Sequence, residues 1–420
     1  MRPDRLLYGP FNERFDKAST IWLDKHSAQV FSLYRNIHSH PELSGHEKRT
    51  SRILAARLKS AGLKVLEGVG GYGVVGILSN GAGPTVLIRA DMDALPVEEE
   101  TGLPYASRTR GVMHACGHDV HTATLAAVAK VFSENRPLWR GTAVFVGQPS
   151  EETASGAQAM VDDPRWKRVP RPGACLGLHV DADVPVGRIS LVSGWFTANT
   201  DSIDVIIHGK GGHGARPHEA EDPIVAAAQV IVALQTIVTR RVDPIEPVVI
   251  TVGSIHAGQK HNIIPDRAVM QLTVRTFSPK VRRQVLSHIK EAVADASRAA
   301  GCRARPEVKT GVEFTAALYN DPRLCEHARS VFTKIIGRGK VVAFPPTTGG
   351  EDFSVYVNAL RVPCLLYGVG AVSPRPLGRF RSPAGRPALH SSRFAPVAQP
   401  TLRMCVRSMC ALAASLMGRP

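Results

Sequence analysis

Three apolar runs in the first half of the chain are each followed by side chains that bind metals or transfer protons. The runs and their polar residues are 85–88 with Asp91 and Asp93, 142–146 with Glu151 and Glu152, and 174–180 with His179. Short apolar runs are typical of buried strands, and α/β sheets place their sites beyond the carboxyl ends of such strands. The pattern therefore predicts an α/β fold whose central, mostly parallel sheet gathers these side chains at one edge.

A fourth segment, residues 113–121, is dense in metal-binding side chains. It contains His114, Cys116, His118 and His121 together with Asp119. Cys116 and His118 are separated by one glycine, so both can face the same way on a turning loop. We expect a helix over 120–131, with Asp119 as its N-cap. Two alternatives stay open at this point: a histidine-rich loop without a ligand, and a nucleophilic Cys116, which needs a base but no metal.

Residues 187–305 predict a different order of strands and helices. Here we expect a strand at 202–208, a helix at 223–238, strands at 248–255 and 268–277, a helix at 279–299, and a strand near 303–310. This β-α-β-β-α-β order is that of the split βαβ, or ferredoxin-like, sandwich, which can fold alone. We therefore predict a metal-binding α/β domain made of residues 1–186 and 306–420, and an inserted domain made of residues 187–305.

Composition narrows the class of protein. The net charge of +16 favours acidic ligands, but the basic residues are spread out and aromatic residues make up only 6% of the chain, which argues against nucleic acid. The seven cysteines have no CxxC spacing, so we expect a reducing compartment rather than a disulfide framework. We find neither a signal-peptide core nor an apolar run near membrane-spanning length, and expect a cytoplasmic protein without a membrane segment.

Seven motifs resemble those of a known enzyme family. They are Asp-Met-Asp-Ala-Leu-Pro at 91–96, His-Ala-Cys-Gly-His-Asp at 114–119, Gln-Pro-Ser-Glu-Glu at 148–152, Gly-Gly-His-Gly-Ala-Arg-Pro-His at 211–218, Asn-Ile-Ile-Pro-Asp at 262–266, Gly-Glu-Asp-Phe at 350–353 and Leu-His at 389–390. In this order they are similar to the aminoacylase/carboxypeptidase family of co-catalytic metallohydrolases. The branch they resemble most is that of the hippurate hydrolases and auxin-conjugate amidohydrolases.

The resemblance implies how the site is built. The residues that would bind two divalent ions per subunit (zinc, manganese, cobalt or nickel) are Cys116, His118, Glu152, His179 and His390. Glu151 would be the general base, and Asp93 would orient a ligand. The plain alternatives are a solvated acidic pair and a strand-end cap. Asp91 stays open as a ligand because relatives carry a histidine there, whereas His114 and His121 are expected to support the ligands.

The resemblance also assigns roles within the inserted domain. His213 would stabilise the oxyanion, and Asn262 and Arg275 would hold the substrate; a turn histidine and a strand-edge arginine are the plain alternatives. It further implies a homodimer formed through this domain, with His213 serving the partner's site. One physical consideration supports the dimer: the expected helix carries a stripe, Val225, Ala228, Ile231 and Leu234, that must be buried against its own sheet or against a second copy.

The reaction implied is hydrolysis of an N-acyl amino acid, such as an N-benzoyl, N-acetyl or indole-acyl conjugate. A dipeptidase or carboxypeptidase on the same fold is the nearest alternative. A binding protein that keeps the fold without turnover is an alternative from another class. The joint presence of metal ligands, base and oxyanion histidine argues against it. We interpret the basic segment 371–387 as a solvated loop.

Overall fold

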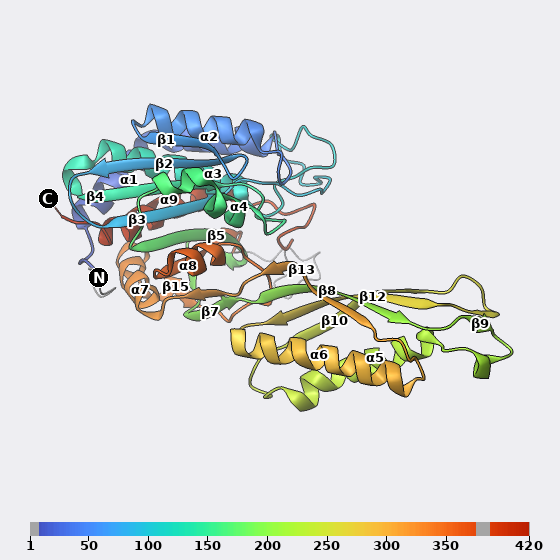
Figure 1. The fold of residues 1–420 in the computed structure, drawn as a ribbon. Coiled ribbons are helices and arrows are strands. Elements are labelled where there is room, and N and C mark those ends of the chain that lie inside the picture. The colour runs from blue at the N-terminus through green and yellow to red at the C-terminus, as the bar shows by residue number, and fades with distance from the viewer. Residues whose placement is uncertain (1–7, 375–386, 420) are drawn as a thin grey trace. The chain divides into compact units, whose positions relative to one another are not determined.

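The computed structural model describes residues 8–374 and 387–419, in two compact units (Figure 1). The larger unit contains residues 8–194, 319–345, 352–374 and 387–419, and the smaller one contains residues 195–318 and 346–351. Most of the segment 371–387, which we interpreted as a basic loop, lies outside the described residues.

The larger unit is built on an eight-stranded mixed sheet with the order β1-β2-β4-β3-β5-β16-β6-β15. In that order the strands are Lys64–Val69, Gly73–Asn80, Gly141–Gln148, Thr85–Asp91, Ala174–Pro185, Cys364–Val372, Ile189–Leu191 and Val341–Ala343. The four central strands, β4, β3, β5 and β16, are mutually parallel. The predicted α/β class with a central, mostly parallel sheet is confirmed.

Register explains why distant motifs meet at one edge of this sheet. Asp91, at the end of β3, pairs with Gln148 at the end of β4. On the other side of β3, Arg89 pairs with Gly177, which places His179 at the level of Asp91. The carboxyl ends of three parallel strands therefore present the side chains that follow the three apolar runs.

Helices bury the sheet on both sides, and β16 is buried along its whole length. The helices of the larger unit are α1 (Glu13–His38), α2 (Lys48–Ser60), α3 (His118–Glu134), α4 (Gly156–Asp162), α7 (Pro322–Ile336), α8 (Ser354–Leu360) and α9 (Ala398–Ser415). Helices α1, α3 and α9 contact one another, and α3 is buried along most of its length. A helix enclosed in this way holds its first residue, His118, in a fixed position.

The smaller unit is a four-stranded antiparallel sheet covered by two helices. The sheet order is β10 (Val249–Ala257), β12 (Arg267–Thr276), β8 (Asn199–His208) and β13 (Glu307–Thr315), and the helices are α5 (Pro223–Thr236) and α6 (Pro279–Ala299). Two short strands of this unit, β9 (Gly212–His213) and β11 (Ile263–Ile264), pair with each other. Strands β7 (Gly194–Thr197) and β14 (Leu318–Asn320) also pair, and they contain the residues at which the chain passes from one unit to the other.

The main segment of this unit runs from Trp195 to Leu318, whereas the sequence predicted 187–305, and residues 346–351 belong to the unit as well. The C-terminal bound lies later than predicted because β13 pairs with β8 and so belongs to the smaller unit's sheet.

Two sequence-based details differ in the structure. Gly117, in the left-handed conformation at φ 84°, precedes α3 as its N-cap, and the Asp119 side chain instead bonds to His38 and to the backbone N–H of Val120. In α5 the face buried against the sheet is Ala226, Ala227, Val230 and Leu234, so Val225 and Ala228 of the expected stripe are exposed.

Among the described residues, one helical segment, Pro223–Arg241, is long and apolar enough to cross a membrane by length and composition. The sequence predicted no segment of this length, and in this segment Gln229 and Gln235 interrupt the apolar run. Its buried face packs on the sheet of its own unit, and core helices of soluble proteins pass the same test. It is therefore weak evidence for a membrane span.

Candidate metal centre

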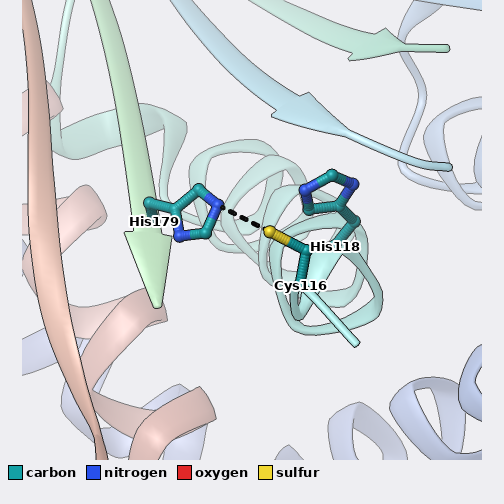
Figure 2. A group of neighbouring side chains, drawn as sticks. All are labelled: Cys116, His118 and His179. Atoms are coloured by element: carbon teal, nitrogen blue, oxygen red, sulfur yellow. Dashed lines mark hydrogen bonds between the residues drawn. The ribbon is translucent and has the colours of Figure 1, made fainter. Parts of the chain in front are cut away.

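The loop before α3 is shaped by Gly117. A Cβ at this position would lie 2.3 Å from Val180 Cγ2, and the left-handed φ of 84° also favours glycine. The tight turn carries Cys116 and His118 toward His179 on β5 (Figure 2). Cys116 Sγ lies 3.5 Å from His179 Nε2, and one atom from each of the three residues lies within 4.8 Å of the others.

Backbone carbonyls fix the tautomers of both histidines. His118 Nδ1 lies 2.9 Å from the Asp93 carbonyl, and His179 Nδ1 lies 2.7 Å from the Val180 carbonyl. A carbonyl only accepts, so each Nδ1 carries the proton and donates. Each Nε2 is thereby left with a lone pair facing the cluster, which is the arrangement expected of histidines that bind a metal.

His121 lies near the same cluster, but both of its ring nitrogens have hydrogen-bond partners. The Val180 N–H donates to His121 Nε2 at 2.9 Å, and His121 Nδ1 lies 2.6 Å from Asp91 Oδ1. The N–H can only donate, so Nε2 accepts and Nδ1 donates to the carboxylate. The other Asp91 oxygen, Oδ2, accepts a 2.6 Å bond from Arg89. His121 and Asp91 therefore hold each other, and this favours supporting roles for both.

Glu151 and Glu152 occupy a turn between β4 and α4. Both carboxylates belong to one group of potential ligands with His118, and Glu152 also belongs to a group with Cys116 and His390. His390 adopts a left-handed backbone with φ 67°, and its Nε2 lies 3.5 Å from Glu152 Oε2. The structure thus gathers all five predicted ligands and the predicted base in overlapping groups within the larger unit.

The positions of two atoms in these groups indicate whether a metal ion could bind between them. His118 Nε2 and Glu152 Oε1 are buried, have no hydrogen-bond partner among the residues that the structure describes, and lie 3.8 Å apart. That separation exceeds hydrogen-bond length but suits two atoms that share a metal at about 2.0–2.2 Å from each. The donor set of imidazole, thiolate and carboxylate is typical of zinc and its transition-metal neighbours. The residues therefore fit divalent metal ions.

Cys116 needs a cation to ionise. Burial raises the pKa of its thiol well above the usual range, so the buried side chain is neutral without a positive partner. A metal ion stabilises the thiolate directly, and binding then releases the proton. This chemistry favours ligation over the alternative of a free nucleophilic cysteine, which requires a thiolate without a metal.

The Asp93 carboxylate contacts both the His118 side chain and the backbone of Glu152. Its Oδ1 lies 3.2 Å from His118 Nδ1, while Oδ2 accepts bonds from Ser44 Oγ at 2.7 Å and from the Glu152 N–H at 2.9 Å. Burial alone would raise the pKa of Asp93, but the bond and charge of His118 and the Glu152 N–H hold it below its usual value. Asp93 therefore positions one ligand side chain and the backbone of another.

A second buried network supports the sheet edge, and sequence reasoning missed it. Arg89 donates to Gln148 Oε1 at 2.8 Å, to Asp91 Oδ2 at 2.6 Å and to Asp352 Oδ1 at 2.8 Å. Asp352 also accepts from Gln148 Nε2. The Gly-Glu-Asp-Phe motif was visible in the sequence, but nothing there indicated that its aspartate meets β3 and β4.

The remaining predicted residues lie in the smaller unit. His213 on β9 pairs in register with Ile263 on β11, and the Gly214 N–H donates to the Asn262 carbonyl at 2.9 Å, so His213 and Asn262 are neighbours. Arg275, near the far end of β12, is half-buried and donates to Thr200 Oγ1. Burial lowers the pKa of its guanidinium. The smaller unit brings His213 and Asn262 together but places Arg275 elsewhere.

Comparison with known proteins agrees with this architecture. Residues 87–384 match the model of peptidase family M20/M25/M40. N-acetyl-L-cysteine deacetylase of Bacillus subtilis (strain 168) is 38% identical, over 82% of this chain and 81% of that protein. IAA-amino acid hydrolase ILR1-like 2 of Arabidopsis thaliana is 35% identical, over 80% of this chain and 76% of that protein.

A solved structure extends the match to the fold. The Bacillus subtilis protein YXEP, described as a dinuclear metal-binding peptidase of the M20 family, has a TM-score of 0.79 and 29% identity, covering 94% of this chain and 99% of that one. The predicted resemblance is confirmed, and with the clusters above it identifies a metal-dependent hydrolase. The chain belongs to peptidase family M20/M25/M40.

Proposed function

We propose that the protein hydrolyses the amide bond of N-acyl amino acids and releases a carboxylic acid and a free amino acid. The observation that carries this proposal is that overlapping groups of potential ligands join Cys116, His118, Glu152, His179 and His390, and that Glu151 shares one of these groups with His118 and Glu152. The names of two relatives, a deacetylase of N-acetyl-L-cysteine and a hydrolase of IAA-amino acids, point to the same bond type.

The five ligands would hold two divalent ions, and such a pair polarises a scissile carbonyl and lowers the pKa of a water molecule. Glu151 takes the proton of the attacking water and later returns it to the leaving nitrogen. Its neighbour Glu152 serves as a ligand, which the orphaned Oε1 and the 3.5 Å approach to His390 support. Asp93 keeps His118 and Glu152 in place throughout.

In the smaller unit, His213 and Asn262 lie on neighbouring backbone segments and are assigned to the developing oxyanion and the substrate amide. Arg275 is assigned to the substrate carboxylate, which a guanidinium binds through two parallel hydrogen bonds. Its burial favours this role, because among the described residues this half-buried cation donates one hydrogen bond, to the Thr200 hydroxyl, and a guanidinium has further donors for an anion.

We also propose a homodimer in which these groups come from different copies. Arg267 and Arg275 are eight residues apart on β12, a span of about 27 Å at the usual strand rise. His213 lies beyond the Arg267 end, so one copy cannot bring His213 and Arg275 to the same small substrate. Exposed Ile224, Val225 and Val232 on α5 and the open edge strand β10 give a second copy an apolar surface to cover. The proposed location of this dimer is the cytoplasm.

A substrate panel tests the proposal. Metal-loaded protein is incubated with N-acetyl, N-benzoyl and indole-acyl amino acids and with unblocked dipeptides, and release of free amino acid is measured. The proposal expects turnover of the acylated compounds and little turnover of dipeptides. The reverse preference would identify a dipeptidase or carboxypeptidase, and no turnover of either class at full metal content would identify a binding protein.

A further inference from the structure

The turn that carries Glu151 starts from a strained residue. Ser150 has a φ of 55°, in the left-handed region that residues with a side chain rarely adopt, and Ala154 in the same turn has a φ of 53°. The Ser150 carbonyl accepts bonds from the N–H groups of Ser155 and Gly156 at 3.2 and 3.1 Å. Strain of this kind persists only where the surroundings enforce it, and it concentrates at functional sites.

The side chain that holds Ser150 in this conformation through its backbone N–H is Glu47, at the start of α2. Glu47 Oε1 accepts a 2.7 Å bond from the Ser150 N–H, a 3.3 Å bond from Ser150 Oγ and a 3.0 Å bond from the Gly45 N–H. The side chain is fully buried, and Oε2 has no hydrogen-bond partner within residues 8–374 and 387–419. The contacts of Glu47 are therefore made by one acceptor oxygen, Oε1, and an unpartnered buried polar oxygen such as Oε2 adds nothing favourable to stability.

The two glutamates of the turn are held by different anchors. The Glu152 N–H donates to Asp93, and the Ala154 N–H donates to the Glu151 carbonyl at 2.7 Å. The peptide before Glu151 is fixed through Ser150, whose N–H is held by Glu47. Loss of the Glu47 contact would release the backbone leading into Glu151 while Asp93 still holds Glu152.

We propose that Glu47 is a positioning residue: its carboxylate locks Ser150 in the left-handed conformation that directs Glu151 at the reacting centre. Glu47 touches neither substrate nor metal in this account. The expected effect on kcat rests on the proposed function, whereas the expected effect on the backbone at Ser150 does not.

Two variants of matched size separate this role from simple core packing. Glu47→Gln keeps a carbonyl oxygen for the Ser150 and Gly45 N–H groups and places its amide at the unpartnered Oε2. Glu47→Met fills a similar volume without an acceptor. Burial and the nearby Asp93 carboxylate raise the pKa of Glu47, so a neutral amide is readily accommodated. We expect Glu47→Gln to match the wild type within about threefold in kcat, because the acceptor is preserved.

For Glu47→Met we expect kcat to fall roughly 10- to 100-fold, the usual scale for a group displaced by about 1 Å. KM and a content of two metals per chain should stay as in the wild type. Adding Ser150→Gly should restore kcat roughly three- to tenfold, since glycine adopts a positive φ without penalty. A general packing defect would instead lower metal content and would not be rescued by glycine.

Amide hydrogen exchange of residues 148–156 gives a readout that does not depend on activity. Exchange in this segment should speed up in Glu47→Met and stay unchanged in Glu47→Gln, while β3 and α3 keep wild-type exchange. If Glu47→Met leaves the segment's exchange unchanged, or if Glu47→Gln speeds it up equally, the inference is wrong. Should Glu47→Met not fold, Glu47→Ala is measured in the same way, and failure of both beside a folded Glu47→Gln would assign Glu47 to folding and overturn the proposal.

A wild-type protein that hydrolyses none of the amides would overturn the proposed function alone. The exchange comparison would then still decide whether Glu47 holds the turn.

Discussion

Asp93→Asn tests how the metal centre is held together. The substitution changes one oxygen to an NH₂ group and leaves the shape almost unchanged. Both Asp93 oxygens face donors: Oδ1 faces His118 Nδ1, and Oδ2 faces Ser44 Oγ and the Glu152 N–H. Whichever way the amide turns, its NH₂ meets a donor, so at least one contact is lost and replaced by a repulsive one.

The magnitude follows from which contact is lost. The Asp93 carbonyl holds His118 Nδ1 at 2.9 Å and keeps its tautomer, so the favourable orientation points the NH₂ toward His118. The Glu152 backbone then keeps an acceptor, and the loss is one charge-assisted contact. Removing such a supporting partner lowers metal affinity about 10- to 100-fold, and we expect the lower half of that range, about 10- to 30-fold.

The assay is a competition titration of the apo protein with zinc against a chromophoric chelator, for the wild type, Asp93→Asn and Ser44→Ala. Ser44→Ala removes a single neutral donor and should change the zinc affinity less than about threefold. Unchanged affinity in Asp93→Asn would refute the claim that Asp93 positions His118 and Glu152. A loss of zinc affinity as large as that caused by His118→Ala would refute the claim as well, because it would mean that Asp93 is itself a ligand.

Three further outcomes are expected. His38, buried between Asp119 and Glu99, has its pKa raised to about 9, because its hydrogen bonds with both carboxylates outweigh the desolvation that would lower it. The pKa is higher in the folded state, so this stabilisation is complete below pH 6.5 and is lost as pH rises through 9. Urea titrations should show a fall of about 3 kcal/mol that is absent in His38→Gln. Arg275→Ala should shrink the preference for a free α-carboxylate over its amide roughly 10- to 150-fold in kcat/KM, and equal losses on both substrates would contradict its assigned role. Mixing inactive Glu151→Gln and His213→Ala chains should restore activity after subunit exchange, whereas a mixture that stays inactive despite proven exchange would show that His213 does not serve the partner's site.

Much of the fold could be predicted because its signals are local. Strands β3, β4 and β5 and the strands and helices of the inserted region follow from apolar periodicity and length. The alternation along β8, where every second side chain is buried, is such a signal. The ends of elements were less predictable. Asp119 has the right chemistry and place for an N-cap, but His38, 81 residues away, competes for its carboxylate.

The site was predictable as a set of residue types and not as a set of contacts. Cys116, His118 and Glu152 occur in recognisable motifs, whereas the engagement of His121 by the Val180 N–H depends on how α3 meets β5. Glu47 carries no local signal at all: its function depends on a backbone angle at Ser150, 103 residues later. Residues that act through the backbone of another segment are visible only in the folded chain.

The most direct test of the account compares metal content and kcat in Glu151→Gln. Glu151 is assigned to proton transfer and Glu152 to metal binding, although the two carboxylates are adjacent and share a group with His118. We predict two metals per chain by elemental analysis and a kcat about 10²- to 10⁴-fold below the wild type, the usual scale for removing a general acid–base. Loss of a metal from Glu151→Gln, or wild-type turnover with both metals present, would contradict the assignment.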